Sequence, residues 1–456
     1  MFSPLGDPIY RRLFAAPVIA LAGTGLSTVA LALLAYGLAG GDAGKVLGTA
    51  LAIKMLAYVG IAPCVGGIAH RLPRKAFLVA LNLARAAFVL CLPFVDAVWQ
   101  VYTLIFLLGA CSAAFTPTLQ ATIPDVLPDE ARYTRALSLW RLAYDLENLV
   151  SPTLAAILLS VLSYHSLFVG NGVAFLLSAL LVLSVALPTP AASERPAGVL
   201  FNLRFGVRSY LATPRLRGLL LLSLAVAAAS AMVIVNSVVY LREYLGGSET
   251  DLAIAFAAAG AGSMLAALLL PRVLEKAPER PLMLAGGALM GLGLLLGAAR
   301  PGFLALLALW FVLGLGWSLV QTLSGRLLRS SCQPADRSAL FSAQFALSHA
   351  CWLVTYPLAG WLGASVGLPI TFIVLAGLAG AASFAALLVW PAEESPDLTH
   401  VHGEMEHAHR HVHDGHHMHE HEGWEGSQPH SHPHRHDKVT HRHRFVIDLH
   451  HTYWPA

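Results

Sequence analysis

The feature of this sequence that most constrains its fold is a succession of twelve long apolar segments. They begin near Leu13, Val46, Ala76, Trp99, Ala136, Leu167, Gly218, Asp251, Leu282, Gly302, Ala339 and Leu368. Each is close to the roughly 20 residues that an α-helix needs to cross a bilayer. Charged side chains make up only 12% of the chain, whereas soluble domains average about 25%. The pattern therefore predicts an all-α membrane protein with twelve transmembrane helices surrounded by the lipid bilayer.

The basic residues between these segments predict the orientation of the chain. With the N-terminus inside, eighteen Lys and Arg residues lie on the cytoplasmic side and only Lys45, Arg242 and Arg300 lie outside. Cytoplasmic loops carry such an excess of positive charge. An even number of spans returns the chain to the side on which it began, so both termini are expected in the cytoplasm. The net charge of +3 gives no reason to expect nucleic acid as a partner, because the basic residues lie mainly between the apolar segments and reflect the membrane topology.

The two six-span halves repeat at an offset of 205 residues, which aligns Gly109 with Gly314 and Pro152 with Pro357. Such a repeat predicts two parallel halves related by an axis along the membrane normal. We expect an N-terminal six-helix half over residues 1–187, a cytoplasmic linker over 188–217, a C-terminal six-helix half over 218–392 and a tail over 393–456. The linker has an amphipathic portion near Phe201–Tyr210.

The fifth apolar segment carries charged and polar residues at membrane depth, namely Arg141, Asp145, Glu147 and Asn148. A charge at the centre of a membrane helix costs roughly 2.5–3.5 kcal/mol on translocon scales, so such residues persist mainly where they face a polar cavity or each other. Arg141, Asp145 and Asn148 share one helical face, and Glu147 points away from Asp145. Two interpretations stay open: an Arg141–Asp145 ion pair that only rigidifies the bundle, or a substrate pathway in which these residues couple transport to protons.

His349 lies in the equivalent span of the second half, where the repeat aligns it with Tyr144, next to Asp145. A histidine inside a bundle either carries a proton or metal, or is simply hydrogen-bonded within the structure. Lys54 and Arg85 are expected to be counter-ions or packing groups, since a fixed cation repels a divalent metal.

The tail has a different composition, because 18 of the 21 histidines lie between His400 and His451. Few aliphatic residues accompany them, so we expect a disordered tail. Imidazole suits divalent nickel, copper, zinc and cobalt, and the lack of cysteine in the tail disfavours Cu(I). A purification tag or a pH-responsive low-complexity tail are the alternatives to metal capture. The candidate ligands are His407, His409, His411, His413, His416, His417, His419, His421, His430, His432, His434 and His436.

The segment GGIAHRLPRK, residues 66–75, resembles the loop signature G-x-L-A-D-R-x-G-R-K of major facilitator transporters. The matching residues are Gly66, Ala69, Arg71, Arg74 and Lys75. His70 replaces the usual Asp and Pro73 replaces Gly. The resemblance implies the major facilitator fold and a loop that latches the cytoplasmic side of the two halves. The alternative is that the basic residues only enforce topology.

The N-terminal half, with YRRLFAAPVIALAGTGLSTVALALLAY and GTALAIKMLAYVGIAP, joined to a histidine-rich C-terminus, resembles nickel-resistance exporters of the NreB type. This resemblance implies export of nickel, or cobalt, across a bacterial inner membrane, and hence metal resistance.

Together these features predict a secondary transporter, and not an enzyme, that exchanges a divalent metal for protons. The sequence has no G-x-x-x-x-G-K-[ST] motif that would indicate ATP as the energy source. We expect a monomer that requires no cofactor, with Ni²⁺, Co²⁺ or Zn²⁺ as substrate and tail ligand. The rival functions are efflux of small organic compounds by a protein whose tail buffers metal, and a membrane-anchored metal store or sensor.

Overall fold

The computed structural model describes residues 3–454 apart from 69–72, 128, 130–131, 133–135, 137–138, 141–142, 144–150, 152, 188–198, 276, 333–336, 393–396, 403–404, 412–429, 437–438, 445 and 447–453. The helices of the first half are α1 (Pro8–Ala39), α2 (Ala43–Ile68), α3 (Arg74–Cys91), α4 (Val98–Val126) and α6 (Tyr164–Leu183), with 3-10 turns η1 (Ser3–Gly6), η2 (Gly40–Asp42) and η4 (Leu92–Phe94). Helix α7 (Val199–Ala212) lies between the halves.

The second half contains α8 (Pro214–Val239), the π-helical turn η5 (Tyr240–Tyr244), α9 (Glu249–Val273), α10 (Glu279–Gly297), α11 (Phe303–Arg329), α12 (Arg337–Ser365) and α13 (Leu368–Val389). Eleven of the twelve predicted spans therefore correspond to a long described helix. For the fifth span, the described residues 136, 139, 140, 143, 151 and 153–159 are helical. The predicted all-α membrane body is confirmed.

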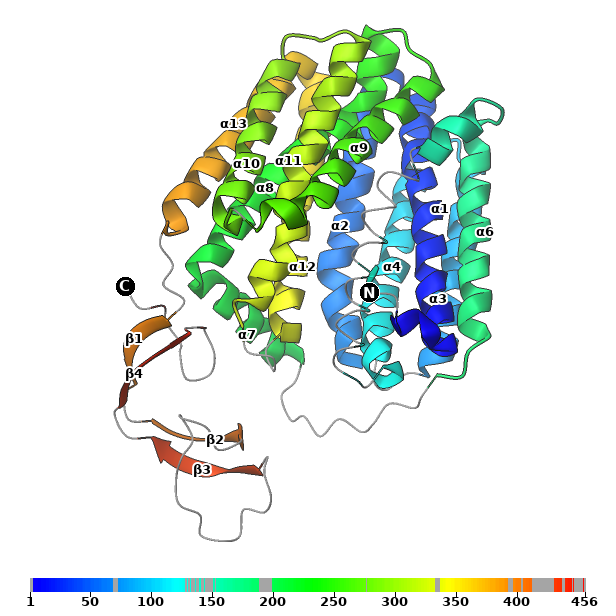
Figure 1. Ribbon diagram of the computed structural model, residues 1–456. Helices are drawn as coiled ribbons and strands as arrows, with labels where there is room; N and C mark the ends of the chain where they lie inside the picture. Colours follow the sequence, from blue (N-terminus) through cyan, green and yellow to red (C-terminus); the bar gives the residue numbers. More distant parts are fainter. Residues whose placement is uncertain are drawn as a thin grey trace.

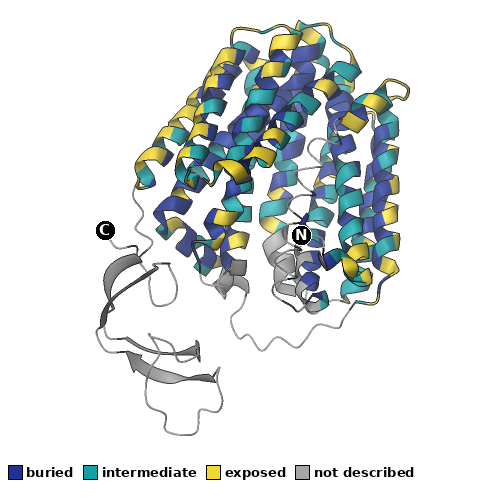
Figure 2. Ribbon diagram, viewed as in Figure 1, coloured by how far each residue is buried: buried dark blue, intermediate teal, exposed yellow. Residues whose placement is uncertain are grey.

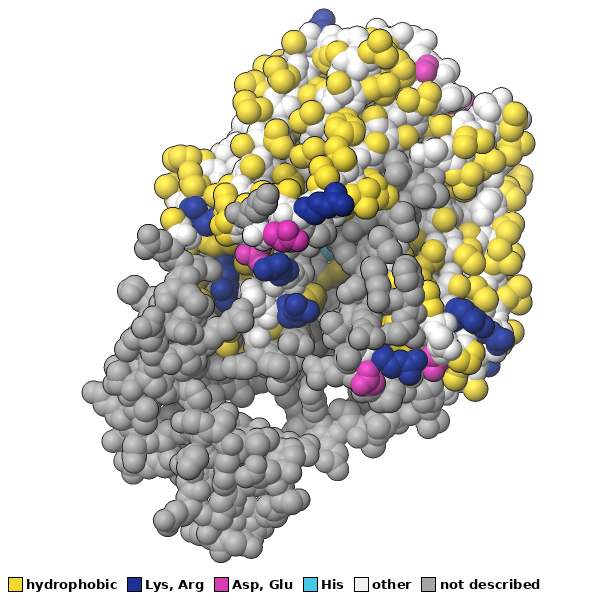
Figure 3. All heavy atoms as spheres, viewed as in Figure 1, with side chains coloured by type: hydrophobic (Ala, Val, Ile, Leu, Met, Phe, Trp, Pro, Cys, Tyr) yellow, Lys and Arg dark blue, Asp and Glu magenta, His cyan; other side chains and the backbone are white. Residues whose placement is uncertain are grey.

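Nine stretches within the described residues are long and apolar enough to cross a membrane, and the first, Pro8–Ile61, contains both α1 and α2. Apolar side chains also cover the outside of the bundle: Leu268, Leu296 and Leu388 are 64%, 67% and 69% exposed. Figure 2 marks exposed residues along the outer helices, and Figure 3 shows apolar side chains over much of the face that it draws. Water disfavours an apolar surface of this extent, so the surface is suited to lipid. The protein is a multi-pass membrane protein.

Local sequence signals fix both ends of the first span. Asp7 caps α1, because its Oδ1 accepts hydrogen bonds from the backbone N–H groups of Ile9 and Tyr10, each 2.9 Å long. Pro8 occupies the first helical position, where its missing N–H costs nothing. The helix ends before Gly40, whose φ of 53° lies in the left-handed region that glycine tolerates.

Figure 1 shows the two groups of helices side by side, with the start of α1, helix α7 and the tail toward the lower end of the view. We call this the linker end; the other end carries η2 and η5. On the face drawn in Figure 3, Lys and Arg side chains gather mainly toward the linker end, below a largely apolar region.

The internal repeat of the sequence is also a repeat of packing. In the first half, a Cβ at Gly109 of α4 would lie 3.3 Å from the Cα of Lys54 in α2. In the second half, a Cβ at Gly314 of α11 would collide with the carbonyl group of Ala259 in α9. Both residues of the second contact lie 205 positions after those of the first. The two halves thus use glycine at the same place to bring equivalent helices together.

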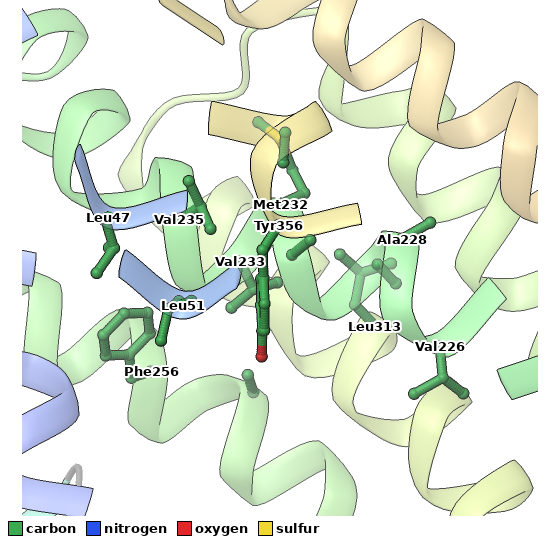
Figure 4. Packing of buried hydrophobic residues seen from close by; sticks show 14 of the residues in the cluster. Leu47, Leu51, Val226, Ala228, Met232, Val233, Val235, Phe256, Leu313 and Tyr356 are labelled. Carbon is green, nitrogen blue, oxygen red and sulfur yellow. The ribbon is translucent and has the colours of Figure 1, made fainter. Parts of the chain in front are cut away.

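The halves meet along a close contact between α2 and α12. A Cβ at Gly48 would lie 2.5 Å from the carbonyl oxygen of Tyr356, and a Cβ at Gly360 would collide with the backbone of Gly44. Figure 4 shows the buried Tyr356 beside apolar residues of α2 and α8. The Trp361 indole N–H also donates to the Thr49 hydroxyl over 3.2 Å. These contacts lie toward the end that carries η2, because α2 begins there.

The amphipathic portion expected in the linker is the helix α7, which packs on the second half. A Cβ at Gly206 would collide with the carbonyl group of Ala339 in α12. The Tyr210 hydroxyl donates a hydrogen bond to Gln344 Oε1, and burial raises the pKa of Tyr210 well above its usual range. Helix α7 therefore has a defined packing position on the second half.

The tail contains four strands, β1 (Asp397–His402), β2 (Met405–His411), β3 (His430–His436) and β4 (Val439–Arg444). Antiparallel pairs form between β1 and β4 and between β2 and β3. The structure thus differs from the disorder expected for the tail, within these four ranges. Histidines at alternate positions have the two-residue period of a strand, so two such stretches can pair without an apolar core.

Candidate functional site

His349, a polar residue that the repeat had singled out, is half-buried on α12 about 18 Å from the start of that helix at a rise of 1.5 Å per residue. Its Nδ1 lies 2.7 Å from the carbonyl oxygen of Phe345. A carbonyl oxygen can only accept, so Nδ1 carries the proton of this hydrogen bond. The neutral ring consequently has its lone pair on Nε2, which is the atom available to a proton, a metal or a ligand.

Three aromatic rings surround this imidazole. The ring centroids of Phe345, Tyr58 and Trp352 lie 3.9, 5.4 and 5.7 Å from that of His349. Phe345, His349 and Trp352 share one face of α12 because they are spaced by four and three residues. Tyr58 comes from α2 in the other half. The Trp352 indole donates to the Ser230 hydroxyl of α8 over 2.8 Å, which fixes that ring. We call these four residues the aromatic cluster.

Lys54 adds a positive charge to this cluster. Its Nζ lies 5.6 Å from the centroid of the Tyr58 ring, one helical turn along α2, which is within cation–π range. No ion pair links Lys54 to a carboxylate of the described residues. Nowhere among the described residues does a group of three or more His, Cys, Asp or Glu side chains lie close enough together to hold a metal ion. As far as it is described, the site combines one imidazole, a cation and three aromatic rings.

The other predicted transport residues, Arg141, Asp145, Glu147 and Asn148, lie outside the described residues. The described ends of their segment pack on α1. The Tyr10 hydroxyl donates to the carbonyl oxygen of Ala136 over 3.4 Å, and the Ser151 hydroxyl donates to that of Ala22 over 3.2 Å. The fifth span is therefore a neighbour of α1 at both ends.

The gating loop and the tail are described only in part. Gly66 is in α2, Arg74 and Lys75 begin α3, and His70 and Arg71 lie outside the described residues. A gating role for this loop stays a prediction. Seven candidate metal ligands have described backbones, namely His407, His409, His411, His430, His432, His434 and His436, whereas His413, His416, His417, His419 and His421 lie outside.

Arg85 is a packing group in the first half. Only 6% of it is exposed, and its guanidinium carbon lies 4.1 and 4.6 Å from the ring centroids of Phe115 and Phe175. It donates to Asn82 Oδ1, and the Asn82 amide donates to the Ser178 hydroxyl over 3.0 Å. The aromatic faces and the amide offset part of the cost of burying the charge.

The aromatic residues of the site were missed by sequence reasoning. The spacing of Phe345, His349 and Trp352 was a usable signal, because it puts three rings on one helical face. Tyr58 gave no comparable signal, since its contact with His349 joins two halves that are far apart in sequence.

Comparison with known proteins agrees with this architecture. A family model described as Major Facilitator Superfamily matches residues 13–235 and 219–426. The uncharacterized MFS-type transporter YfiS of Bacillus subtilis (strain 168) is 24% identical over 333 residues, which are 70% of this chain and 78% of that protein. Macrolide efflux protein A of Enterococcus faecalis is 26% identical over 156 residues, which are 31% of this chain and 47% of that protein.

Two solved structures share the fold. The nucleoside transporter NupG superposes with a TM-score of 0.68 at 12% identity, covering 84% of this chain and 100% of that chain. A bacterial homolog to the human lysosomal transporter Spinster, inward-facing and unoccupied, gives a TM-score of 0.68 at 13% identity and covers 84% and 98%. At these identities the likeness concerns the fold alone. The family model matches well over half of the chain, and the structure is a duplicated bundle of membrane helices. This chain therefore belongs to the Major Facilitator Superfamily and is a transporter.

Proposed function

We propose that this transporter exports a divalent transition metal, nickel in the first place and cobalt in the second, in exchange for protons across a bacterial inner membrane. The observation that carries this proposal is the concentration of 18 of the 21 histidines between His400 and His451. Imidazole nitrogen suits these borderline metals, and the absence of cysteine from the segment disfavours Cu(I). Both termini are cytoplasmic in this proposal, so the tail captures metal on the side from which it is exported.

The strand register supports metal capture by the tail. Opposite each other in β2 and β3 are His407 and His434, His409 and His432, and His411 and His430. Directly opposed residues of an antiparallel pair have Cβ atoms about 4.5–5.5 Å apart, so three histidine pairs follow one another along this ladder. Closely spaced imidazoles favour an ion that takes several nitrogen ligands.

Exchange of metal for protons needs side chains that can bind either one. A carboxylate or an imidazole must lose its proton before it can bind a metal, so metal and proton compete for it. We propose that Asp145 and Glu147 carry the coupled ions, with Arg141 and Asn148 beside them and His349 contributing Nε2 from the other half. Arg141, one turn before Asp145, favours the ionised form of that carboxylate, which leaves Glu147 as the main proton carrier. Lys54 disfavours a metal directly at the aromatic cluster, so the carboxylates have to supply most of the binding.

A second candidate function, efflux of an organic compound, is favoured by the aromatic cluster. Tyr58, Phe345 and Trp352 offer ring faces around His349, and Lys54 offers a positive charge. Aromatic faces with a few polar groups are typical of sites for organic ligands. The relative from Enterococcus faecalis is named for macrolide efflux, which adds weight to this alternative.

The two functions are separated by tolerance tests in a metal-sensitive and macrolide-sensitive bacterial host. The full chain, a chain ending at Pro391 and an empty vector are compared for growth in nickel, cobalt, zinc and a macrolide, with cellular nickel measured in parallel. We expect the full chain to raise nickel tolerance and lower cellular nickel, and the truncated chain to keep part of this effect. Macrolide tolerance without any change in cellular nickel would favour the second function. More cellular nickel with no tolerance would indicate a metal store.

A further inference from the structure

The last residues of the tail differ from its histidine-rich part. After Arg444 the sequence continues FVIDLHHTYWPA, with the aliphatic and aromatic residues that the preceding fifty positions nearly lack. Two residues of this stretch are described. Val446 is only 4% exposed, and Trp454 is half-buried. A buried valine and a half-buried tryptophan so close to the end of a polar tail indicate contact with another part of the protein.

One contact of Trp454 is with Arg215, in the first turn of α8. The guanidinium carbon lies 5.7 Å from the centroid of the Trp454 ring, within the distance at which a cation is attracted to an aromatic face. Arg215 is itself held in place by the end of α11. Its Nε donates to the Ser331 hydroxyl over 2.8 Å, and a terminal nitrogen donates to the carbonyl oxygen of Ser330 over 3.0 Å. Trp454 therefore meets a preformed, oriented partner.

The beginning of the tail lies on the same turn of α8. Trp390, which follows α13, is 3% exposed, and a Cβ at Gly218 would lie 3.0 Å from its ring and its Cβ. The carbonyl oxygen of Trp390 accepts a hydrogen bond from Arg280 Nε over 2.9 Å. Arg215 and Gly218 are three positions apart, which places them on one face of the helix. Both ends of the tail thus contact one helical turn.

We propose that Trp454 docks on Arg215 in the first turn of α8 and that this contact closes the histidine-rich tail into a loop. The partner of this surface is a segment of the same chain. The antiparallel pair of β1 with β4 places Arg444 opposite Asp397, so the chain returns toward the start of the tail; Figure 1 shows these two strands side by side. The strands with the histidine pairs are held between the two anchors.

Docking matters for transport because it limits the volume that the tail can explore. A segment fixed at both ends has a higher effective concentration near its anchor than a tail fixed at one end. This consequence rests on the proposed metal export: metal bound by the loop is kept at the linker end of the second half, next to the start of α8 and the end of α11. The docking itself does not depend on the substrate.

The docking is tested by placing the photo-crosslinking residue p-benzoylphenylalanine at position 454 of the full chain in native membranes. After irradiation, mass spectrometry maps the attachment points. We expect crosslinks within one chain to peptides that contain residues 214–218 or 329–332. The same chain with Arg215→Gln should lose most of this product. Crosslinks confined to the tail, to lipid or to a second copy would overturn the proposal, whatever the protein exports.

The consequence for transport is tested with Trp454→Ala and its matched control Trp454→Phe, which keeps an aromatic face. Nickel bound per chain, measured on the purified full chain, should be the same for both, since neither removes a histidine. We expect Trp454→Ala to lower the rate of nickel export several-fold at low nickel and little at saturating nickel, and Trp454→Phe to resemble the wild type. Equal export by both variants at low nickel would overturn the role of the loop in delivery.

Discussion

The two halves share one packing plan but differ in where they bury polar groups. Gly109 and Gly314 make equivalent contacts, yet the partner is Lys54 in the first half and Ala259 in the second. The same offset of 205 relates the buried Arg85 to Met290, which is fully buried as well. Duplication therefore kept the small residues that set helix spacing and changed the chemistry of the side chains between them.

A second pair of contacts shows how this difference is accommodated. In the first half, Asn82 of α3 donates to the Ser178 hydroxyl of α6. The aligned residues are Gly287 of α10 and Ser383 of α13, where a Cβ at the glycine would collide with the serine hydroxyl. In the first half, the Asn82 amide thus orients Arg85. In the second half, Gly287 lets α10 approach Ser383 of α13 directly. Among the described residues, the charged side chains near the middle of a membrane helix, Lys54 and Arg85, both belong to the first half, whereas the buried Arg215 of the second half lies in the first turn of α8.

The largest effect on stability is expected for Met290→Arg, which places in the second half the charge that Arg85 places in the first. Val320 and Gly380 occupy the positions aligned with Phe115 and Phe175, so the two aromatic faces that contact Arg85 have no counterpart in the second half. An unpaired buried charge costs about 3–5 kcal/mol. We expect a large fall in the midpoint of thermal unfolding in detergent, or loss of the protein from the membrane.

The matched control is Met290→Leu, a volume-conserving change that should cost less than about 1.5 kcal/mol. If Met290→Arg left the stability unchanged, the second half would be able to accommodate a charge at this depth. The two halves would then differ in sequence but not in their capacity to bury a charge.

A smaller effect is expected when the shared glycines are compared. Alanine at Gly314 collides with a backbone carbonyl group, which cannot move aside without shifting α9, and overpacking of this kind costs about 1–3 kcal/mol. Alanine at Gly109 meets the Ala57 Cβ and the Lys54 Cα at 3.3 Å, which a slight shift can relieve. We expect Gly314→Ala to lower the unfolding midpoint more than Gly109→Ala does. Equal effects would contradict the tighter contact of the second half.

The smallest expected effect on stability is that of Lys54→Ala, which introduces the residue found at Ala259. Loss of the contact with Tyr58 costs about 0.5–1 kcal/mol. Because a fixed cation repels a divalent metal, the nickel concentration for half-maximal flux should fall several-fold. Lys54→Arg keeps the charge and serves as the control. A rise in that concentration would instead show that Lys54 pairs with a carboxylate that transport needs.

Much of the fold was predictable because membrane helices can be recognised in a sequence by their length and apolar composition. Eleven predicted spans match described helices. The repeat was visible because a few small residues, such as Gly109 and Gly314, recur at one offset. The aromatic cluster was not predictable, since Tyr58 and His349 meet only after the halves assemble. Strands in the tail were missed because the low aliphatic content was weighed above the two-residue period. The carboxylates Asp145 and Glu147 remain predictions from sequence.

The most direct test of the proposed function is nickel uptake into inverted membrane vesicles with an imposed inside-acid proton gradient. The wild-type chain should accumulate nickel, and an uncoupler should abolish the accumulation. Glu147→Gln, at wild-type abundance in the membrane, should move nickel without responding to the gradient, because the acid proposed to carry the proton is gone. Nickel uptake that is absent from the wild type, or that has the same gradient dependence in the wild type and in Glu147→Gln, His349→Ala and Asp145→Asn, would contradict the account.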